Sequence, residues 1–197
     1  MNTELILALA AFAFVSSITP GPNNLMLMAS GANYGFRRTL PHMLGVGLGF
    51  MVMLLLVGLG LIQVFDAYPV SYTVLKVVSA AYLLFLAWKI ATAAAQNSSE
   101  QNGRPFTFLQ AAAFQWVNPK AIAMAFTAIT VYAPSRDLSA VLVVALVFGG
   151  INFPCVSSWT VLGQQMKRFL MAPWRLRAFN IVMAVLLLGS LIPMLDL

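Results

Sequence analysis

The stretch Thr19-Pro-Gly-Pro-Asn-Asn24 interrupts an apolar sequence that runs from about Glu4 to Asn33. Two prolines remove backbone N–H donors there and Gly21 adds backbone freedom, so a continuous helix is not expected. If the flanking sequence lies in a bilayer, the carbonyl and amide groups freed at the break need partners in protein or in a water-filled cavity. The stretch therefore predicts a broken helix that lines a cavity or makes a tight internal contact.

A second interruption, Gln115-Trp-Val-Asn-Pro-Lys120, lies about half the chain length further on, within the apolar range from about Phe106 to Ala133. Asn118 can cap a new half-helix, and Pro119 suits its first position. Two proline kinks that serve only packing are the alternative interpretation. The matching positions of the breaks in the two halves of the chain favour a shared role.

The composition indicates a membrane protein. Of the 197 residues, 61% are hydrophobic and 8% are charged, against roughly 25% charged residues in soluble domains. The length allows about six spans of about 20 residues each and no separate soluble domain. We therefore predict an all-α integral membrane fold in a single domain, 1–197. The four further spans are expected at about Met43 to Ile62, Val70 to Ala95, Leu138 to Gly163 and Ala178 to Leu195.

A polar loop at about 96–105 divides the chain into two parts, about 1–95 and 106–197, of three spans each. Because three is odd, the second part must insert upside down relative to the first. The two breaks, in the first and fourth spans, then face each other near the middle of the membrane. Two inverted three-helix repeats with paired broken helices are the pattern of secondary transporters.

The net charge of +6 comes from basic residues spread between apolar runs rather than clustered with aromatic residues on one soluble face. This distribution argues against nucleic-acid binding. Most of these residues fall in the first, third and fifth connections, so the positive-inside rule predicts that those connections are cytoplasmic and that both termini lie outside. No Lys or Arg precedes the first apolar run, so we expect that run to be retained and not cleaved as a signal.

The breaks supply the candidate site. The N-terminus of a half-helix presents free N–H groups and a positive dipole end, which suit a carboxylate. Lys120 would add a full positive charge, with snorkelling to the interface as its alternative role. Asn152, beside Pro154 in the fifth span, can line the cavity or close a kink with a hydrogen bond. The predicted substrate-binding residues are Thr19, Pro20, Gly21, Pro22, Asn23, Asn24, Gln115, Asn118, Pro119, Lys120 and Asn152.

Further motifs follow along the chain: Gly35-Phe-Arg37, Gly45-Val-Gly-Leu-Gly49, Ala81-Tyr-Leu-Leu-Phe-Leu-Ala-Trp-Lys89, and Trp159 with Gly163 and Arg168. Together with the two breaks, they resemble the lysine-exporter (LysE) superfamily, in particular its homoserine/threonine-exporter (RhtB) branch, over essentially the whole chain. The resemblance implies a secondary transporter of the bacterial inner membrane that exports amino acids or their derivatives, driven by the proton gradient. Lysine-specific members carry an acidic residue near the first break, whereas this chain has Asn23 and Asn24. We therefore expect a neutral or hydroxylated substrate.

Proton coupling has two candidate residues. The acidic residues Glu4, Asp66, Glu100, Asp137 and Asp196 all fall at span ends or in loops, so none is expected to carry a proton through the membrane. His42, at the start of the second span, and Lys120 are the coupling hypotheses. An interfacial His42 with no proton role is the alternative.

Other functions find little support in the sequence. No His, Asp or Glu cluster, nucleophile elbow or metal-ligand spacing appears, so we expect no enzyme, cofactor or metal site. A small-solute channel and a membrane assembly subunit without transport activity remain alternatives. The expected partners are the amino-acid substrate, protons and the lipid bilayer, and a homo-oligomer remains open. The glycine pairs Gly31/Gly35 and Gly45/Gly49 are spaced for close helix approach, expected within the chain rather than between copies.

Overall fold

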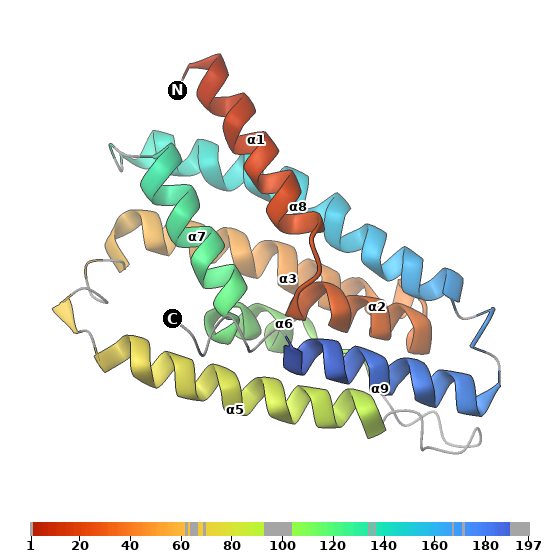
Figure 1. Cartoon of the computed structure of the whole chain (residues 1–197). Helices are drawn as coiled ribbons and strands as arrows, with labels where there is room; N and C mark the ends of the chain where they lie inside the picture. The colour runs from red at the N-terminus through yellow and green to blue at the C-terminus, as the bar shows by residue number, and fades with distance from the viewer. Residues whose placement is uncertain are drawn as a thin grey trace.

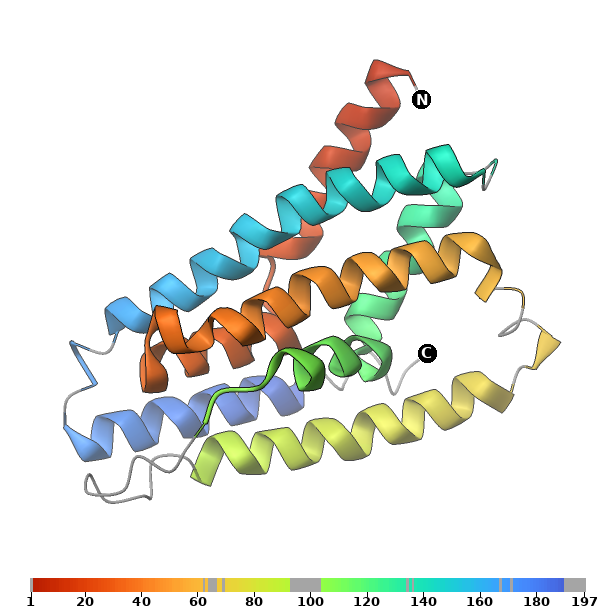
Figure 2. The same cartoon turned by 180° about the vertical axis from the view of Figure 1, so that it is seen from behind.

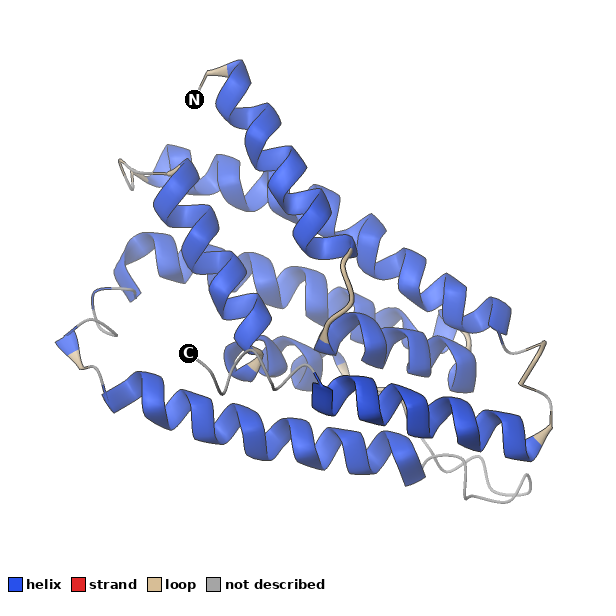
Figure 3. Cartoon of the chain, viewed as in Figure 1, coloured by secondary structure: helices blue, strands red, loops and turns tan. Residues whose placement is uncertain are grey.

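The structure, a computed structural model, describes residues 2–61, 63, 67–68, 70–92, 104–133, 135, 137–166, 168–170 and 172–189. All regular elements in these ranges are helices, and no strand occurs among them (Figure 3). The predicted all-α class is therefore confirmed for the described chain. The predicted loop at 96–103 and the predicted span ends at Ala95 and Leu195 lie outside the described residues.

The helices follow the predicted order, with both predicted breaks present. The first half contains α1 (Thr3–Ile18), α2 (Pro22–Tyr34), α3 (Phe36–Leu56) continued by a wider turn at Val57–Leu61, and α5 (Val70–Thr92). The second half contains α6 (Phe108–Phe114), a 3₁₀ turn (Gln115–Val117), α7 (Pro119–Tyr132), α8 (Leu138–Met166) and α9 (Pro173–Gly189). Each half thus begins with a broken helix, continues with a long apolar helix and ends with one further helix.

Several of these helices can cross a bilayer. Phe36–Leu61 and Leu138–Met166 are long and apolar enough to do so, and α1 with α2 forms a third candidate span that bends by 54° at its break. The described residues therefore support a membrane protein with two or three such spans by length and composition. The arrangement of six spans stays a prediction.

The second and sixth spans begin earlier than predicted. Gly35, at φ 80°, turns the chain between α2 and α3, a conformation that favours glycine. The N–H of Phe36 then donates to the side-chain oxygen of Gln164 at 2.6 Å, so α3 starts at Phe36 and not at Met43. Arg37 therefore lies in a helix and not in a loop. Likewise α9 begins at Pro173, since proline suits the first turn of a helix.

Helices of the two halves pack crosswise. The helix α8 contacts α1 and α2, α3 contacts α6, and α5 lies beside α9 (Figure 1). Glycines allow the closest approaches: a Cβ on Gly163 would lie 2.0 Å from the carbonyl oxygen of Met28, and one on Gly31 would lie 2.2 Å from that of Thr160. Gly45 and Gly49 similarly face the backbone of α6. The predicted internal packing is confirmed for Gly31, Gly45 and Gly49, whereas Gly35 forms the turn between α2 and α3.

Most of the basic residues that the structure describes lie at one end of the molecule. There α2, α5 and α8 end and α3 and α9 begin (Figure 1). The basic residues near those helix ends are Arg37, Arg38, Lys89, Arg104, Arg168, Arg175 and Arg177. This basic end is the one that the positive-inside rule assigns to the cytoplasm.

Candidate functional site

The first break leaves the carbonyl groups at the end of α1 without partners in the helix, because residues 19–21 are not helical. Side chains from other segments supply the missing donors. The amide of Asn24 donates to the carbonyl oxygens of Ser17 and Thr19, both at 2.8 Å, and the indole N–H of Trp159 donates to that of Ile18 at 3.1 Å. The end of α1 is thus stabilised by side chains of α2 and α8.

Lys120, from the second break, completes this set of donors. Its ammonium donates to the carbonyl oxygen and the hydroxyl of Thr19 at 2.8 and 2.9 Å, and to the carbonyl oxygen of Pro20 at 3.2 Å. Its aliphatic stem passes over Gly21, where a Cβ would lie 2.7 Å from Lys120 Cδ. A cation at the C-terminal end of a helix also interacts favourably with the helix dipole. Lys120 therefore points into the first break.

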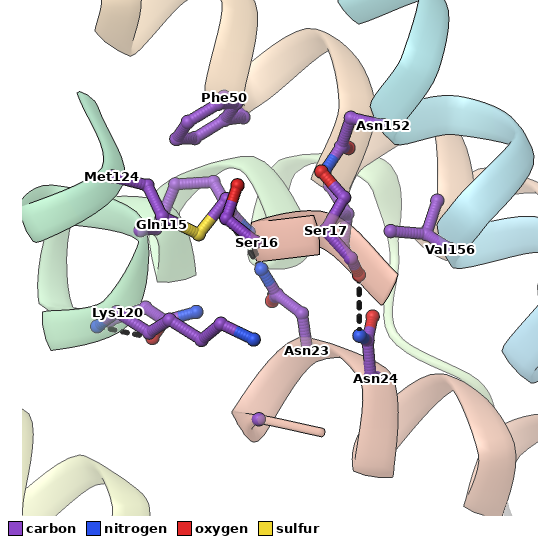
Figure 4. A pocket seen from close by; sticks show the side chains of 14 residues that line it. Ser16, Ser17, Asn23, Asn24, Phe50, Gln115, Lys120, Met124, Asn152 and Val156 are labelled. Atoms are coloured by element: carbon purple, nitrogen blue, oxygen red, sulfur yellow. Dashed lines mark hydrogen bonds between the residues drawn. The ribbon is translucent and has the colours of Figure 1, made fainter. Parts of the chain in front are cut away.

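The two breaks touch through a pair of side-chain amides. Asn23 Nδ2 donates to Gln115 Oε1 at 2.8 Å, and Gln115 Nε2 donates back to Asn23 Oδ1 at 3.2 Å (Figure 4). Gln115 also donates to the carbonyl oxygen of Ala111 and has no exposed surface. A reciprocal amide pair in an apolar protein satisfies four polar atoms at once, which fixes the distance between α2 and the 3₁₀ turn.

The two half-helix N-termini differ in their caps. Asn118 adopts an extended conformation, and its side chain accepts from the N–H of Lys120 at 3.2 Å, which caps α7. No described side chain caps α2, whose N-cap residue is Gly21. Pro22 and Pro119 occupy the first positions of α2 and α7. The positive end of α2 is therefore the less satisfied of the two.

A buried polar pair joins α8 to the first break. Asn152 Nδ2 donates to the hydroxyl of Ser17 at 3.0 Å, and both residues are buried. The side-chain oxygen of Asn152 is buried and has no hydrogen-bond partner in the described structure. A buried acceptor without a partner is costly, and it is therefore a point at which a ligand could donate a hydrogen bond.

These groups surround one narrow cavity between the breaks (Figure 4). Its free space of about 20 Å³ is enough for on the order of one water molecule. The residues that line it are Ser16, Ser17, Gly21, Asn23, Asn24, Val46, Phe50, Gln115, Asn118, Lys120, Ala121, Met124, Asn152 and Val156. This free space is too small for a larger solute, which could bind between the breaks only if they moved apart.

Comparison with known proteins identifies the family. A family model described as "LysE type translocator" matches residues 14–190. The chain belongs to the LysE-type translocator family. It is accordingly a membrane transporter and not an enzyme.

Curated relatives of this LysE-type translocator cover nearly its whole length. A cysteine/O-acetylserine efflux protein of Escherichia coli O139:H28 (strain E24377A / ETEC) is 32% identical over 192 residues, which are 95% of this chain and 96% of the relative. Proteins of the same name from Escherichia coli (strain K12) and Shigella sonnei (strain Ss046) are each 32% identical over 191 residues, which are 95% of both chains. No solved structure matches the chain.

The structure brings together the residues that the sequence singled out at the two breaks. Thr19 and Pro20 take part chiefly through their carbonyl oxygens, and Pro22 and Pro119 set the starts of α2 and α7. His42 lies elsewhere: it is buried within α3 and lines a second cavity. The acidic residues of the described chain, Glu4 and Asp137, lie at the starts of α1 and α8, away from the breaks.

Sequence reasoning missed three polar members of the site in this LysE-type translocator. Ser16 and Ser17 line the cavity from the last turn of α1, and Trp159 reaches the break from α8. Two consecutive serines directly before Ile18 and Thr19 are a signal that could have been used, because polar residues are rare within spans. Trp159 belongs to one of the motifs quoted above, but its contact with the break depends on the packing of α8 against α1.

Proposed function

We propose that this LysE-type translocator is a secondary transporter that exports a small neutral or hydroxylated amino acid, or a derivative of one, from the cytoplasm. One observation carries the proposal: two helix breaks from opposite halves of an apolar chain meet around a polar cavity. Broken helices that meet near the middle of a membrane are where secondary transporters hold their substrates.

The cavity presents complementary charge to both ends of an amino acid. The carbonyl oxygens of Thr19 and Pro20 already hold one ammonium group, that of Lys120. A substrate ammonium can replace it there, next to the negative dipole end of α1. The displaced Lys120 and the uncapped N-terminus of α2 then bind the substrate carboxylate.

The described site favours a substrate without a basic side chain. It contains no carboxylate to neutralise an additional positive charge, and Asn23 and Asn24 offer only neutral amides. The unpartnered oxygen of Asn152 is suited to accept a hydrogen bond from a hydroxyl or thiol of the substrate. The names of the curated relatives, which specify cysteine and O-acetylserine, agree with a small polar substrate of this kind.

The proposal includes six spans in two inverted repeats, 1–95 and 106–197, in a bacterial inner membrane with both termini outside. The matching order of elements in the two halves supports the repeats. The packing between the halves, in which α8 lies against α1 and α2 and α3 lies against α6, supports them as well. The basic residues at one end support the orientation.

Because the cavity is too narrow for an amino acid, transport requires the breaks to separate and open toward each side in turn. Proton coupling, which we include in the proposal, then needs a titratable group that changes its partners during this movement. Lys120, at the contact between the breaks, and His42, buried in α3, are the candidate residues. Replacing each with Gln and measuring the pH dependence of efflux tests both, and wild-type coupling in both variants would exclude them.

The test of the proposal is flux in proteoliposomes that contain the purified chain. We expect saturable transport of O-acetyl-L-serine, L-cysteine, L-homoserine or L-threonine, accelerated by a pH gradient. The double variant Asn23→Ala/Gln115→Ala should lose this flux, while Ser157→Ala, a half-buried position on α8 outside the cavity, should keep it. Flux that rises without saturation would instead indicate a channel, and absence of flux for all these solutes would contradict the proposal.

A further inference from the structure

A second cavity lies at the basic end of the molecule, between α2, α3, α5 and the chain that leads into α6. Figure 2 shows that chain passing between α5 and the start of α3. The free space of this cavity, about 60 Å³, is larger than that between the breaks. It is thus the more open of the two cavities and lies on the side assigned to the cytoplasm.

Two positive charges line this cavity. Lys89, near the end of α5, and Arg104 both contribute to its wall, and no acidic residue does so among the described residues. The Lys89 ammonium lies 5.0 Å from the centre of the Phe106 ring, a position that holds the charge at the mouth of the cavity. Two cations without a neighbouring carboxylate create a positive potential that attracts an anion.

The wall also contains a buried donor that lacks a partner. His42 is only 1% exposed, and neither of its ring nitrogens has a hydrogen-bond partner within the described structure. The Phe106 ring lies against it in an edge-to-face contact at 5.2 Å. Leaving a buried imidazole unpaired is costly. A ligand that accepts a hydrogen bond in this cavity would remove that cost.

One face of α2 connects the two cavities. Met26, Ser30 and Asn33 line the second cavity, and Asn23 lines the first. These four positions are spaced by three or four residues, so they follow one side of the helix. A solute that leaves the second cavity along this side meets the polar break within about two helical turns.

We propose that this second cavity is a cytoplasmic loading site that binds the carboxylate of the amino-acid substrate, with Lys89 and Arg104 as its cationic ligands and His42 as a hydrogen-bond donor. The inference rests on the proposed function, since it assigns a second position on the path of the same substrate. Phosphate groups share this chemistry with carboxylates, and the phosphate of an anionic lipid is the other possible source.

The experiment measures flux separately from each side of the membrane. In inside-out vesicles, uptake of radiolabelled O-acetyl-L-serine corresponds to export. Lys89→Gln and Arg104→Gln should each raise the KM at the cytoplasmic face about tenfold, because each removes a charge-assisted contact. The maximal rate of export should stay unchanged. Because a substitution cannot change the equilibrium distribution of the solute, the ratio of maximal rate to KM should fall by the same factor in the opposite direction. Lys89→Arg should restore the wild-type KM.

Controls separate a local effect from a loss of general charge. Arg37→Gln and Arg175→Gln remove basic residues at the same end that do not line the cavity, and they should leave the KM unchanged. L-serine should compete for uptake, whereas L-serinamide, which lacks the carboxylate, should not. His42→Gln, which keeps a donor, should affect the KM less than His42→Leu.

The possible outcomes are distinct. If the wild-type protein takes up the probe and both variants have the same KM as the wild type, the loading site is wrong and the proposed function stands. A wild-type protein that transports none of the amino acids would overturn both. If the KM of the wild type depends on added phosphatidylglycerol, and this dependence disappears in Lys89→Gln, the cavity binds a lipid phosphate and the carboxylate assignment is wrong.

Discussion

The two helix breaks differ in how their backbone groups are satisfied. In the second break, neighbouring residues satisfy the backbone groups: a 3₁₀ turn continues α6 to Val117, and Asn118 caps α7. The first break leaves an extended connection between α1 and α2, and donors from α2, α7 and α8 bind its carbonyl oxygens. A break that depends on distant side chains can be opened by removing them, whereas a locally capped break cannot. The first break is therefore the one suited to move.

The largest expected effect comes from Lys120, which joins the two breaks. Lys120→Met removes the donor shared by Thr19 and Pro20 and leaves the carbonyl oxygen of Pro20 without its described donor. We expect a loss of about 2–4 kcal/mol in stability, seen as a lower thermal unfolding temperature in detergent, and transport at background level. Lys120→Arg should keep most of the stability. Unchanged unfolding of the Met variant would contradict the role of Lys120 in holding the break.

A smaller effect compares the asparagines of the two breaks. Asn24→Ala removes two hydrogen bonds to the end of α1, and we expect it to cost about 2 kcal/mol. Asn118→Ala removes a single cap and should cost about 1 kcal/mol, and Asn118→Ser should recover most of that loss. Thermal unfolding of the three variants checks the order. Equal losses at Asn24 and Asn118 would show that the two breaks are satisfied to the same degree.

The smallest effect concerns Asp137, an exposed cap outside the spans, at the start of α8. Hydrogen bonds from the hydroxyls of Ser135 and Ser139, then from the N–H of Ala140, hold the pKa of its carboxyl below the usual range. A lowered pKa contributes stability above the pKa of the unfolded chain, about 3.9. That contribution is lost as the pH falls through the folded-state value.

Asp137→Asn should therefore flatten the acid side of the curve of unfolding temperature against pH, with little change in transport. Glu4→Gln, at the start of α1, is the matched control for removing one exposed carboxylate. If the unfolding temperature of Asp137→Asn falls at low pH as steeply as that of the wild type, Asp137 does not contribute to the acid dependence of stability.

The backbone chemistry of the breaks was predictable from sequence because proline acts locally. Pro22 and Pro119 cannot donate a hydrogen bond wherever the chain folds, and the helices indeed restart at these residues. The glycines that face α6 and α8 were likewise recognisable by spacing. The partners of the freed carbonyl groups were not, because the contact of Trp159 with Ile18 follows from tertiary packing.

His42 shows a different limit. The sequence placed His42 at the start of the second span, whereas α3 already begins at Phe36 and buries His42 against other helices. The hydrogen bond between Phe36 and Gln164, which are far apart in the sequence, accompanies this early start. Span boundaries set by such contacts cannot be read from hydropathy alone.

The dependence of the first break on the second half has a consequence for biosynthesis. A ribosome releases α1 and α2 into the membrane long before it has made Lys120 and Trp159. Until then, the carbonyl groups of Ile18 and Pro20 lack their protein donors, so the nascent first half must stay near water or a chaperone in the insertion machinery. A chain that terminates after α5 should consequently be a target for membrane proteases, and co-expression of the missing half should rescue it.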